Sequence, residues 1–242
     1  MNELLNIKSL KAWYTEGSPV LKGLDLVLEK NSVIGLIGLN GAGKTTLMNV
    51  ICGLHPGYET SEIEMDGKAA RFTDKNFKMQ RYIVFSEDES FGYFTFDEYI
   101  AYVFKAYKKT QNPEYINELV ERFGFEEHRP KLIKDLSLGN RRKAYLIAGF
   151  ALRPEFLLLD EPVNGLDFNS TETLYSLISD YKKYGTVLFS SHILESVTLT
   201  SDKVLVLEEG VIAKTYSGSE ITAENIRASL ETDAAEMGAG GQ

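Results

Sequence analysis

The N-terminal third of the chain carries the alternating and continuous apolar patterns that are typical of β-strands. Large apolar residues recur at every second position, at Leu24, Leu26 and Leu28, which indicates a strand. The apolar run over residues 32–37 indicates a central strand, and a glycine-rich turn leads from it into a helix predicted over 45–54. The further strands predicted in this part of the chain are 4–14, 20–29, 62–65 and 82–85.

The middle third of the chain changes to a helical pattern. Aromatic and aliphatic residues recur at helical spacing over residues 95–109. Asn112 and Pro113 form a typical helix start, Gly124 forms a typical helix end, and Ser137 starts a third helix. We therefore predict an inserted α-helical subdomain over about residues 92–152.

The last third of the chain returns to strands that alternate with helices. The pattern predicts a strand at 156–160, a helix at 169–184, a strand at 186–190 and a hairpin around Gly210. These elements indicate an α/β fold, which we expect to occupy residues 1–230 as one domain. The remaining residues, 231–242, are acidic and then rich in Gly and Ala, so we expect a flexible C-terminal tail.

The composition excludes several classes of protein. The 242 residues are 43% hydrophobic and 25% charged, as in an ordinary globular domain, and no apolar run approaches the roughly 20 residues that span a bilayer. Glu3, Asn6 and Lys8 interrupt the first apolar residues, so no signal peptide is expected. A single cysteine, Cys52, excludes an internal disulfide and is expected in the core. The net charge of −9 argues against nucleic-acid binding as the main task, but it does not argue against nucleotide binding.

A glycine-rich segment between a predicted strand and a predicted helix has the spacing of a phosphate-binding loop. It fits the pattern G-x-x-x-x-G-K-[ST], in which backbone N–H groups and the helix N-terminus surround phosphate groups. Lys44 would neutralise the phosphate oxygens, and Thr45 would ligate Mg²⁺. The residues expected to bind the nucleotide here are Gly38, Asn40, Gly41, Ala42, Gly43, Lys44, Thr45 and Thr46.

A second acidic element follows the apolar strand at 156–160. A phosphate loop needs a nearby carboxylate for its metal ion, and Asp160 is placed to supply it. Glu161 would then act as the general base that polarises the attacking water. The alternative is that both carboxylates only cap the loop after the strand.

Three further motifs resemble those of ABC ATPases. The run Leu136-Ser137-Leu138-Gly139-Asn140 resembles the LSGGQ signature, and it precedes Asp160 as it does in that family. The segments 164–167 and 190–192 resemble the D-loop and the switch histidine, in the family's order. The resemblance extends from the first strands to the hairpin near Gly210. It implies a P-loop NTPase (RecA-like) core with an N-terminal antiparallel β subdomain and an inserted α-helical subdomain.

The resemblance also assigns roles to single residues. It implies that Tyr14 stacks on adenine, although Trp13 is an alternative and either ring could be an ordinary sheet residue. It implies that Asp167 belongs to the nucleotide site and that His192 lies beside the γ-phosphate as a catalytic residue with Lys44 and Glu161. Without the other motifs, His192 would be read as a polar residue at a strand end.

The signature region is expected to bind nucleotide from its helix N-terminus. Ser137 is typical of a helix N-cap, and an N-terminus with free N–H groups also binds phosphate. The resemblance implies that Ser137 and Gly139 contact a nucleotide held by a second subunit. Leu138 and Asn140 depart from the family's glycine and glutamine, which changes the donors that are offered to the nucleotide.

A second departure from the family lies in the segment Phe85-Ser86-Glu87. Glu87 stands where glutamine is usual, and a glutamate there resembles exporter-type ATPases whose membrane subunits are separate chains. We expect its carboxylate to lie near Mg²⁺ and to couple the nucleotide to transport. The alternative is an exposed acidic residue beside Asp88 and Glu89.

The combined motifs predict the ATP-hydrolysing subunit of an ABC transporter, with export favoured over import. The resemblance implies ATP and Mg²⁺ as ligands, a head-to-tail dimer with itself or a similar ATPase subunit, and transmembrane permease subunits on separate chains. The subunit would be cytoplasmic and peripheral on the membrane through that partner. The alternatives are a soluble ABC ATPase in a non-transport process, or another P-loop enzyme such as a small-molecule kinase or GTPase. The transported substrate is not readable from this chain, because the partner would contact it.

Overall fold

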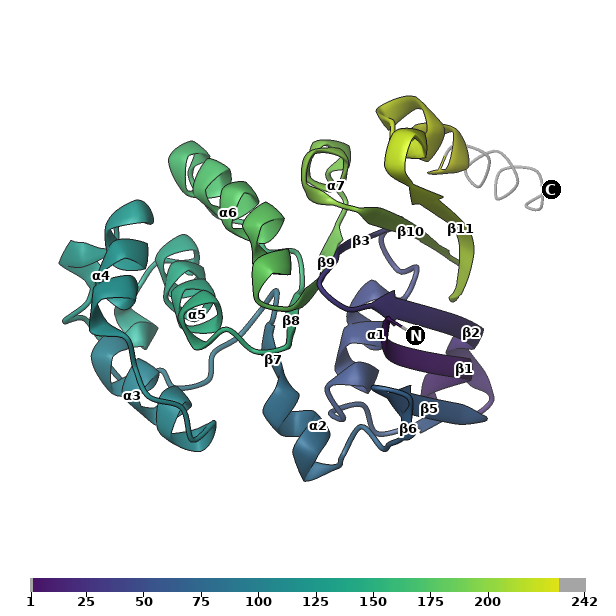
Figure 1. The fold of residues 1–242 in the computed structure, drawn as a ribbon, viewed down its shortest axis with the longest axis horizontal. Helices are drawn as coiled ribbons and strands as arrows, with labels where there is room; N and C mark the ends of the chain where they lie inside the picture. The colour runs from purple at the N-terminus through teal and green to yellow at the C-terminus, as the bar shows by residue number, and fades with distance from the viewer. Residues whose placement is uncertain (1, 231–242) are drawn as a thin grey trace.

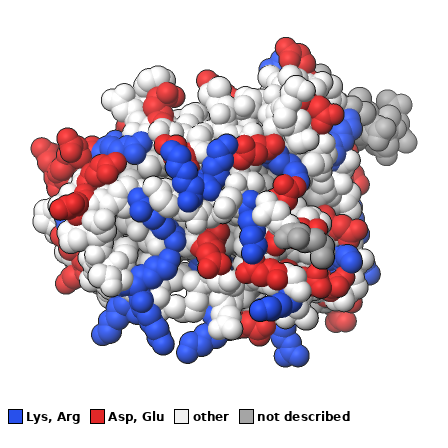
Figure 2. All heavy atoms as spheres, viewed as in Figure 1, with Lys and Arg blue, Asp and Glu red and all other residues white. Residues whose placement is uncertain are grey.

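The computed structural model describes residues 2–230 of the chain. It confirms the predicted fold class, with an antiparallel β subdomain, a largely parallel sheet and helices around it (Figure 1). The tail predicted for residues 231–242 lies outside the described residues. Among the described residues, no helix is long and apolar enough to cross a membrane. Acidic and basic side chains are interspersed over the face shown in Figure 2.

The N-terminal subdomain is a five-stranded antiparallel sheet in the order β2-β1-β5-β6, with β4 paired to β1. The alternation read from the sequence is observed, because Leu24, Leu26 and Leu28 are buried and the residues between them, Asp25 and Val27, are exposed. The strands are β1 (Glu3–Thr15), β2 (Ser18–Glu29), β4 (Tyr58–Glu59), β5 (Glu62–Met65) and β6 (Lys68–Ala69).

The central sheet has six strands in the order β11-β10-β3-β9-β8-β7, and β11 alone is antiparallel to its neighbour. All five residues of β3 are buried, as the continuous apolar run predicts. Parallel strands place their carboxyl ends at one edge, where ligands bind in open α/β sheets. The strands are β3 (Val33–Ile37), β7 (Arg81–Val84), β8 (Phe156–Leu159), β9 (Thr186–Ser191), β10 (Lys203–Glu208) and β11 (Val211–Ser217).

Helix α1 (Lys44–Ile51) lies between the two sheets (Figure 1). Its buried residues pack in one apolar cluster with residues of β1, β2, β3 and β9. Arg81, at the start of β7, donates to the carbonyl oxygens of Cys52 (2.5 Å) and Phe72 (2.7 Å), and so secures the C-terminal end of α1. Cys52 is buried as predicted, with 7% of its surface exposed, and burial raises the pKa of its thiol to about 12.

Three helices gather on the side of the molecule away from the antiparallel sheet (Figure 1), in the segment where the helical insert is predicted. They are α3 (Phe96–Ala106), α4 (Pro113–Arg122) and α5 (Leu138–Leu152). The start signals are observed as caps: the Asn112 side chain accepts from the N–H of Tyr115, and the Ser137 hydroxyl accepts from the N–H of Asn140. Short 3₁₀ turns connect α4 to α5 at Glu126–His128 and Ile133–Asp135.

Several boundaries differ from the sequence predictions. Helix α1 ends at Ile51 rather than 54, because Gly53 turns the chain with a positive φ of 67°. Helix α6 (Phe168–Asp180) passes into a 3₁₀ turn at Tyr181–Lys183 instead of remaining α-helical to 184. Strands β4 and β6 and helix α2 (Lys75–Gln80) were not predicted, because elements this short hold too few residues to show a period. The chain continues through α7 (Leu194–Thr200) and a helical stretch at 223–230.

Candidate nucleotide-hydrolysis site

The predicted phosphate loop connects β3 to α1 and has the backbone geometry that its glycines permit. Gly41 and Gly43 have positive φ angles of 86° and 109°, a region that disfavours side chains. A Cβ atom on Gly38 would lie 2.3 Å from the carbonyl oxygen of Leu207, so this position admits only glycine. The ammonium of Lys44 folds back over the loop and donates to the carbonyl oxygen of Gly38 at 2.8 Å.

A hollow of about 380 Å³ lies in front of this loop. Its size falls within the range of about 300–1,000 Å³ that is usual for small-molecule sites. Most of the predicted nucleotide-binding residues share its wall with the predicted catalytic residues Lys44 and Glu161. The residues that line it are Tyr14, Val20, Asn40, Gly41, Gly43, Lys44, Thr45, Thr46 and Glu161.

The end of β8 brings Asp160 against the phosphate loop. Its carboxylate is fully buried and accepts a hydrogen bond of 3.0 Å from the hydroxyl of Thr45. The Ser190 hydroxyl, on the neighbouring strand β9, donates to the same carboxylate at 2.6 Å and accepts from the N–H of Glu161 at 2.8 Å. Sequence reasoning did not select Ser190 as a site residue, although it stands two residues before His192.

Glu161 lies between the two other predicted catalytic side chains. Its Oε1 is 3.7 Å from Nζ of Lys44, and its Oε2 is 2.7 Å from Nδ1 of His192. Because a carboxylate only accepts, Nδ1 of His192 carries the proton of this hydrogen bond. Only 11% of the Glu161 side chain is exposed, whereas 50% of the His192 side chain is. Asp160 and Glu161 therefore lie beside the other predicted site residues, and their roles in metal binding and catalysis stay predictions.

The backbone of Glu161 adopts an uncommon conformation. Its φ is +47°, in the left-handed region that non-glycine residues adopt at an energetic cost. Such conformations persist where neighbouring groups fix them, and they concentrate at functional sites. The hydrogen bond from its N–H to Ser190 is one such constraint.

The structure distinguishes between the two aromatic candidates for adenine stacking. Tyr14 borders the hollow, is 62% exposed, and has its hydroxyl 3.5 Å from the hydroxyl of Thr46. Trp13 instead packs against Gly57, where an added Cβ would lie 2.7 Å from its Nε1. The Tyr14 ring also contacts the ring of His55, with centroids 4.6 Å apart, and adenine stacking by Tyr14 stays a prediction.

The signature segment lies at the start of α5 and is not among the residues that line the hollow in this chain. Contact of Gly139 with a nucleotide stays a prediction, and the structure shows a further requirement for glycine at this position. An added Cβ would lie 2.1 Å from the carbonyl oxygen of Gly165, in the D-loop of the same chain. Asn140, which stands in place of the glutamine of the signature, places its side-chain amide 3.1 Å from Nε2 of His128.

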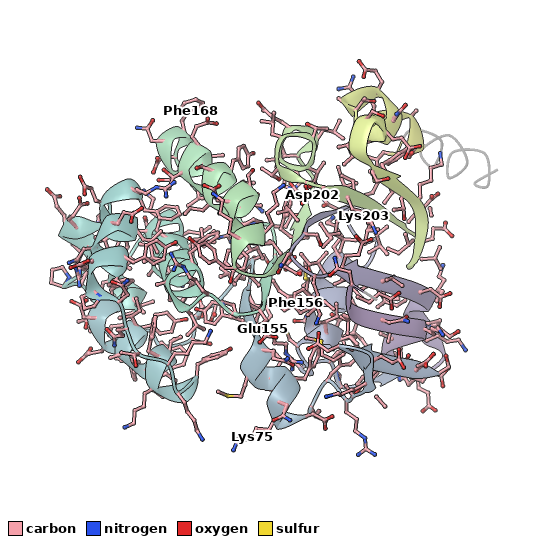
Figure 3. All side chains as sticks on the ribbon, viewed as in Figure 1. Lys75, Glu155, Phe156, Phe168, Asp202 and Lys203 are labelled. Carbon is pink, nitrogen blue, oxygen red and sulfur yellow. The ribbon has the colours of Figure 1, made fainter. Side chains whose placement is uncertain are left out.

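Asp167 caps helix α6 and pairs with a lysine of α5. Its carboxylate accepts from the N–H of Ser170 at 2.9 Å and from Nζ of Lys143 at 2.7 Å. These bonds, with the one from Lys143 first, hold the pKa of Asp167 well below its usual range. The carboxylate does not line the hollow, so nucleotide binding by Asp167 stays a prediction. Phe168, the next residue, is 78% exposed and points outward from α6 (Figure 3).

Glu87 lies in the loop that follows β7 and is exposed. Among residues 2–230, no group of three or more His, Cys, Asp or Glu side chains is placed to hold a metal ion, and Glu87 does not line the hollow. Metal binding by Glu87 therefore stays a prediction. The loop itself is held by α5, because Arg142 donates to the carbonyl oxygen of Ser86 and Tyr145 donates to that of Ser90. Arg142 was not selected from the sequence, since nothing local indicates its long-range contacts.

Comparison with known proteins agrees with this geometry. The family described as "ABC transporter" matches residues 21–164. The ABC transporter ATP-binding protein AlbC of Bacillus subtilis is 35% identical over 224 residues, which cover 90% of this chain and 94% of that protein. The spermidine/putrescine import ATP-binding protein PotA of Thermotoga maritima is 30% identical, over 90% of this chain and 59% of that protein.

A solved structure of the ATP-binding subunit of an ABC transporter has a similar fold. It superposes with a TM-score of 0.78 at 25% identity, and the match covers 95% of this chain and 94% of that one. The family match, the relatives and the arrangement around the phosphate loop point to the same activity. The chain belongs to the ABC transporter family, as an ATP-binding subunit whose ATPase activity energises a transporter.

Proposed function

We propose that this chain hydrolyses ATP with Mg²⁺ to drive export through transmembrane subunits on separate chains. The observation that carries the hydrolytic part is the position of Glu161, which lines one hollow with Lys44 and is hydrogen-bonded to His192. The choice of export rests on Glu87 alone, and the relatives include the import protein PotA.

The phosphate loop would bind the triphosphate, and Tyr14 would stack on the adenine. Lys44 is 8% exposed, so its charge acts on phosphate oxygens from a site that is largely shielded from water. The donor set beside it suits Mg²⁺, because the Thr45 hydroxyl and the Asp160 carboxylate are hard oxygen ligands 3.0 Å apart. Bound there, Mg²⁺ would neutralise charge on the phosphate oxygens.

Hydrolysis would use Glu161 as the base that takes the proton of the attacking water. One oxygen of its carboxylate is engaged by Nδ1 of His192, which fixes the direction of the other. With Nδ1 engaged by Glu161, Nε2 is the ring nitrogen that is left for the nucleotide. Protonation of Nε2 would turn it into a donor for the γ-phosphate.

The signature would act on a nucleotide held by a second subunit. Ser137 and Gly139 are not among the residues that line the hollow of their own chain, which supports an arrangement in which two copies pair head to tail. Mixing Lys44→Ala chains with Ser137→Arg chains leaves one composite site with both defects and one with neither. We expect activity to return on mixing, and a verified mixture no more active than either variant alone would contradict the paired arrangement.

We place the subunit at the cytoplasmic face of a membrane, bound to its transmembrane partner through the region around Glu87. Co-purification of the full chain from membranes with a multi-span protein would support this, whereas recovery without one would contradict it. We expect Glu87→Ala to retain basal ATPase activity but to show weaker stimulation by the reconstituted partner. Glu89→Ala is the matched control, because the Glu89 side chain is 93% exposed. Equal stimulation of both variants would remove Glu87 from the site.

The interspersed charges on the face in Figure 2 and the net charge of −9 support a role without nucleic acid. The transported substrate would be contacted by the transmembrane subunits, so identifying the protein that co-purifies also narrows the substrate class.

A further inference from the structure

Arg142 joins three segments that are far apart in the sequence. It lies in the first turns of α5, just after the signature, and only 4% of it is exposed. One end nitrogen, Nη1, donates to the carbonyl oxygen of Glu161, and the other, Nη2, donates to that of Ser86. The single guanidinium of Arg142 therefore contacts both Glu161, the proposed general base, and the start of the loop 86–90.

The charge of Arg142 is buried without a hydrogen bond to a carboxylate among the described residues. Burial is the main influence on its pKa and lowers it, while the nearby carboxylates of Asp160, Glu161 and Glu87 act in the opposite direction. A buried charge is costly unless its surroundings compensate it. A residue that only filled space in α5 would not need a guanidinium here.

The contact with Glu161 fixes an unfavourable backbone. The φ of +47° at Glu161 is held on one side by Ser190, which accepts from its N–H, and on the other by Arg142, which donates to its carbonyl oxygen. The side chain then extends to His192 and Lys44. The direction of the carboxylate therefore depends on both constraints.

The contact with Ser86 fixes the start of the loop that carries Glu87. The far end of the same loop is held from one turn further along α5, where the Tyr145 hydroxyl donates to the carbonyl oxygen of Ser90. The planar guanidinium of Arg142 is rigid and donates to Ser86 and Glu161 at the same time. A movement of the loop would therefore displace Arg142 and, with it, the backbone of Glu161.

We propose that Arg142 is a positioning residue that keeps Glu161 and the loop 86–90 in one arrangement, so that ATP hydrolysis requires an ordered loop. The proposal goes beyond the transport function. It relies on the proposed role of Glu161 only for its kinetic consequence, and the order of the loop can be measured independently.

The test uses the full chain with Arg142→Gln and Arg142→Lys, and Arg122→Gln as the matched control on the more exposed helix α4. We expect Arg142→Gln to lower kcat by about 10- to 100-fold, which is about 1.4–2.7 kcal/mol at 1.36 kcal/mol per tenfold, with KM for ATP within about threefold. Arg142→Lys keeps the charge but not the planar fork, so we expect an intermediate kcat. The control should match the wild type.

The order of the loop is measured by limited digestion with a glutamate-specific protease, followed by mass spectrometry. Cleavage after Glu87 and Glu89 should accelerate about tenfold in Arg142→Gln, while cleavage at exposed glutamates outside the loop, such as Glu114, should not change. Along the series wild type, Arg142→Lys, Arg142→Gln, we expect kcat to fall and the rate of loop cleavage to rise.

Three results would overturn the proposal. They are a fall in kcat with unchanged loop cleavage, a faster loop cleavage with unchanged kcat, and a failure of both Arg142 variants to fold, which would assign Arg142 to stability. Glu161→Gln is measured beside them. If that variant turned over at the wild-type rate, the base assignment would fail, while the protease readout would still decide whether Arg142 orders the loop.

Discussion

Ser190 offers a sharp test of how β9 supports the hydrolytic site. Its hydroxyl is fully buried, donates to Asp160 at 2.6 Å and accepts from the N–H of Glu161 at 2.8 Å. Ser190→Ala removes both bonds and hardly changes the volume of the side chain. Asp160 keeps its bond from Thr45, whereas the N–H of Glu161 loses the partner that the structure shows for it.

The size of the effect follows from these two losses. A hydrogen bond to a charged group contributes about 1.5–3 kcal/mol, and a buried N–H left without a partner costs about 1–3 kcal/mol. Allowing for partial relaxation, we expect Ser190→Ala to lower the free energy of unfolding by about 3 kcal/mol. In a domain of this size, each kcal/mol shifts Tm by about 2–4 °C, so Tm should fall by roughly 6–12 °C.

Differential scanning calorimetry and ATPase assays measure the two consequences. Ser176→Ala is the matched control, because Ser176 is exposed on α6 and such surface changes stay within about 0.5 kcal/mol. We also expect kcat of Ser190→Ala to fall by about tenfold, since Asp160 and Glu161 both lose a fixed neighbour. A Tm equal to that of the control would refute the reasoning that this hydroxyl supports the site.

Three further predictions concern other parts of the site. Glu161→Gln should bind ATP normally but lower turnover by about 10²–10⁴-fold, because an amide cannot accept the proton of water; size-exclusion chromatography with Mg-ATP should show an accumulated dimer. Gly139→Ala should lower Tm, because its Cβ would meet the carbonyl oxygen of Gly165 at 2.1 Å and the two loops would have to separate; an unchanged melting curve would contradict the close packing. Lys143→Met should destabilise the chain at neutral pH. The pKa of Asp167 is lowered in the folded chain, so its stabilisation is present above its ordinary value of about 3.9 and is lost as the pH falls through the folded value. We therefore expect the difference in the free energy of unfolding between Lys143→Met and the wild type to become smaller as the pH falls below about 3.9. Urea titrations at a series of pH values would measure this difference.

The sequence predicted the parts of the site that depend on local chemistry. The phosphate loop could be recognised because its glycines and the lysine that follows them are close together in the chain. The structure then shows the positive φ angles that these glycines permit. The start of α5 was readable because Ser137 has the typical residue type for an N-cap, and the structure shows that bond. Asp160 was readable because an apolar strand ends directly before it.

The parts that were missed depend on contacts between distant segments. Arg142 reaches Ser86 across 56 residues, and Ser190 reaches Asp160 across 30. The reason for Gly139 was also missed, because a motif records which residue is present but not that Gly165 lies against it. The order of the central sheet is equally non-local, since β3 lies between β10 and β9.

The single cysteine of the chain has a practical consequence for measuring motion. Cys52 lies under the end of α1, and its thiol is both shielded and held in the unreactive protonated form by a pKa of about 12. Maleimide reagents modify accessible thiolates, so the natural chain should remain unlabelled under native conditions. Introduced cysteines at exposed positions such as Phe168 would then carry spectroscopic probes without removal of the native one. The burial of Cys52 makes the unmodified sequence a ready background for testing whether two copies of the chain approach each other when ATP binds.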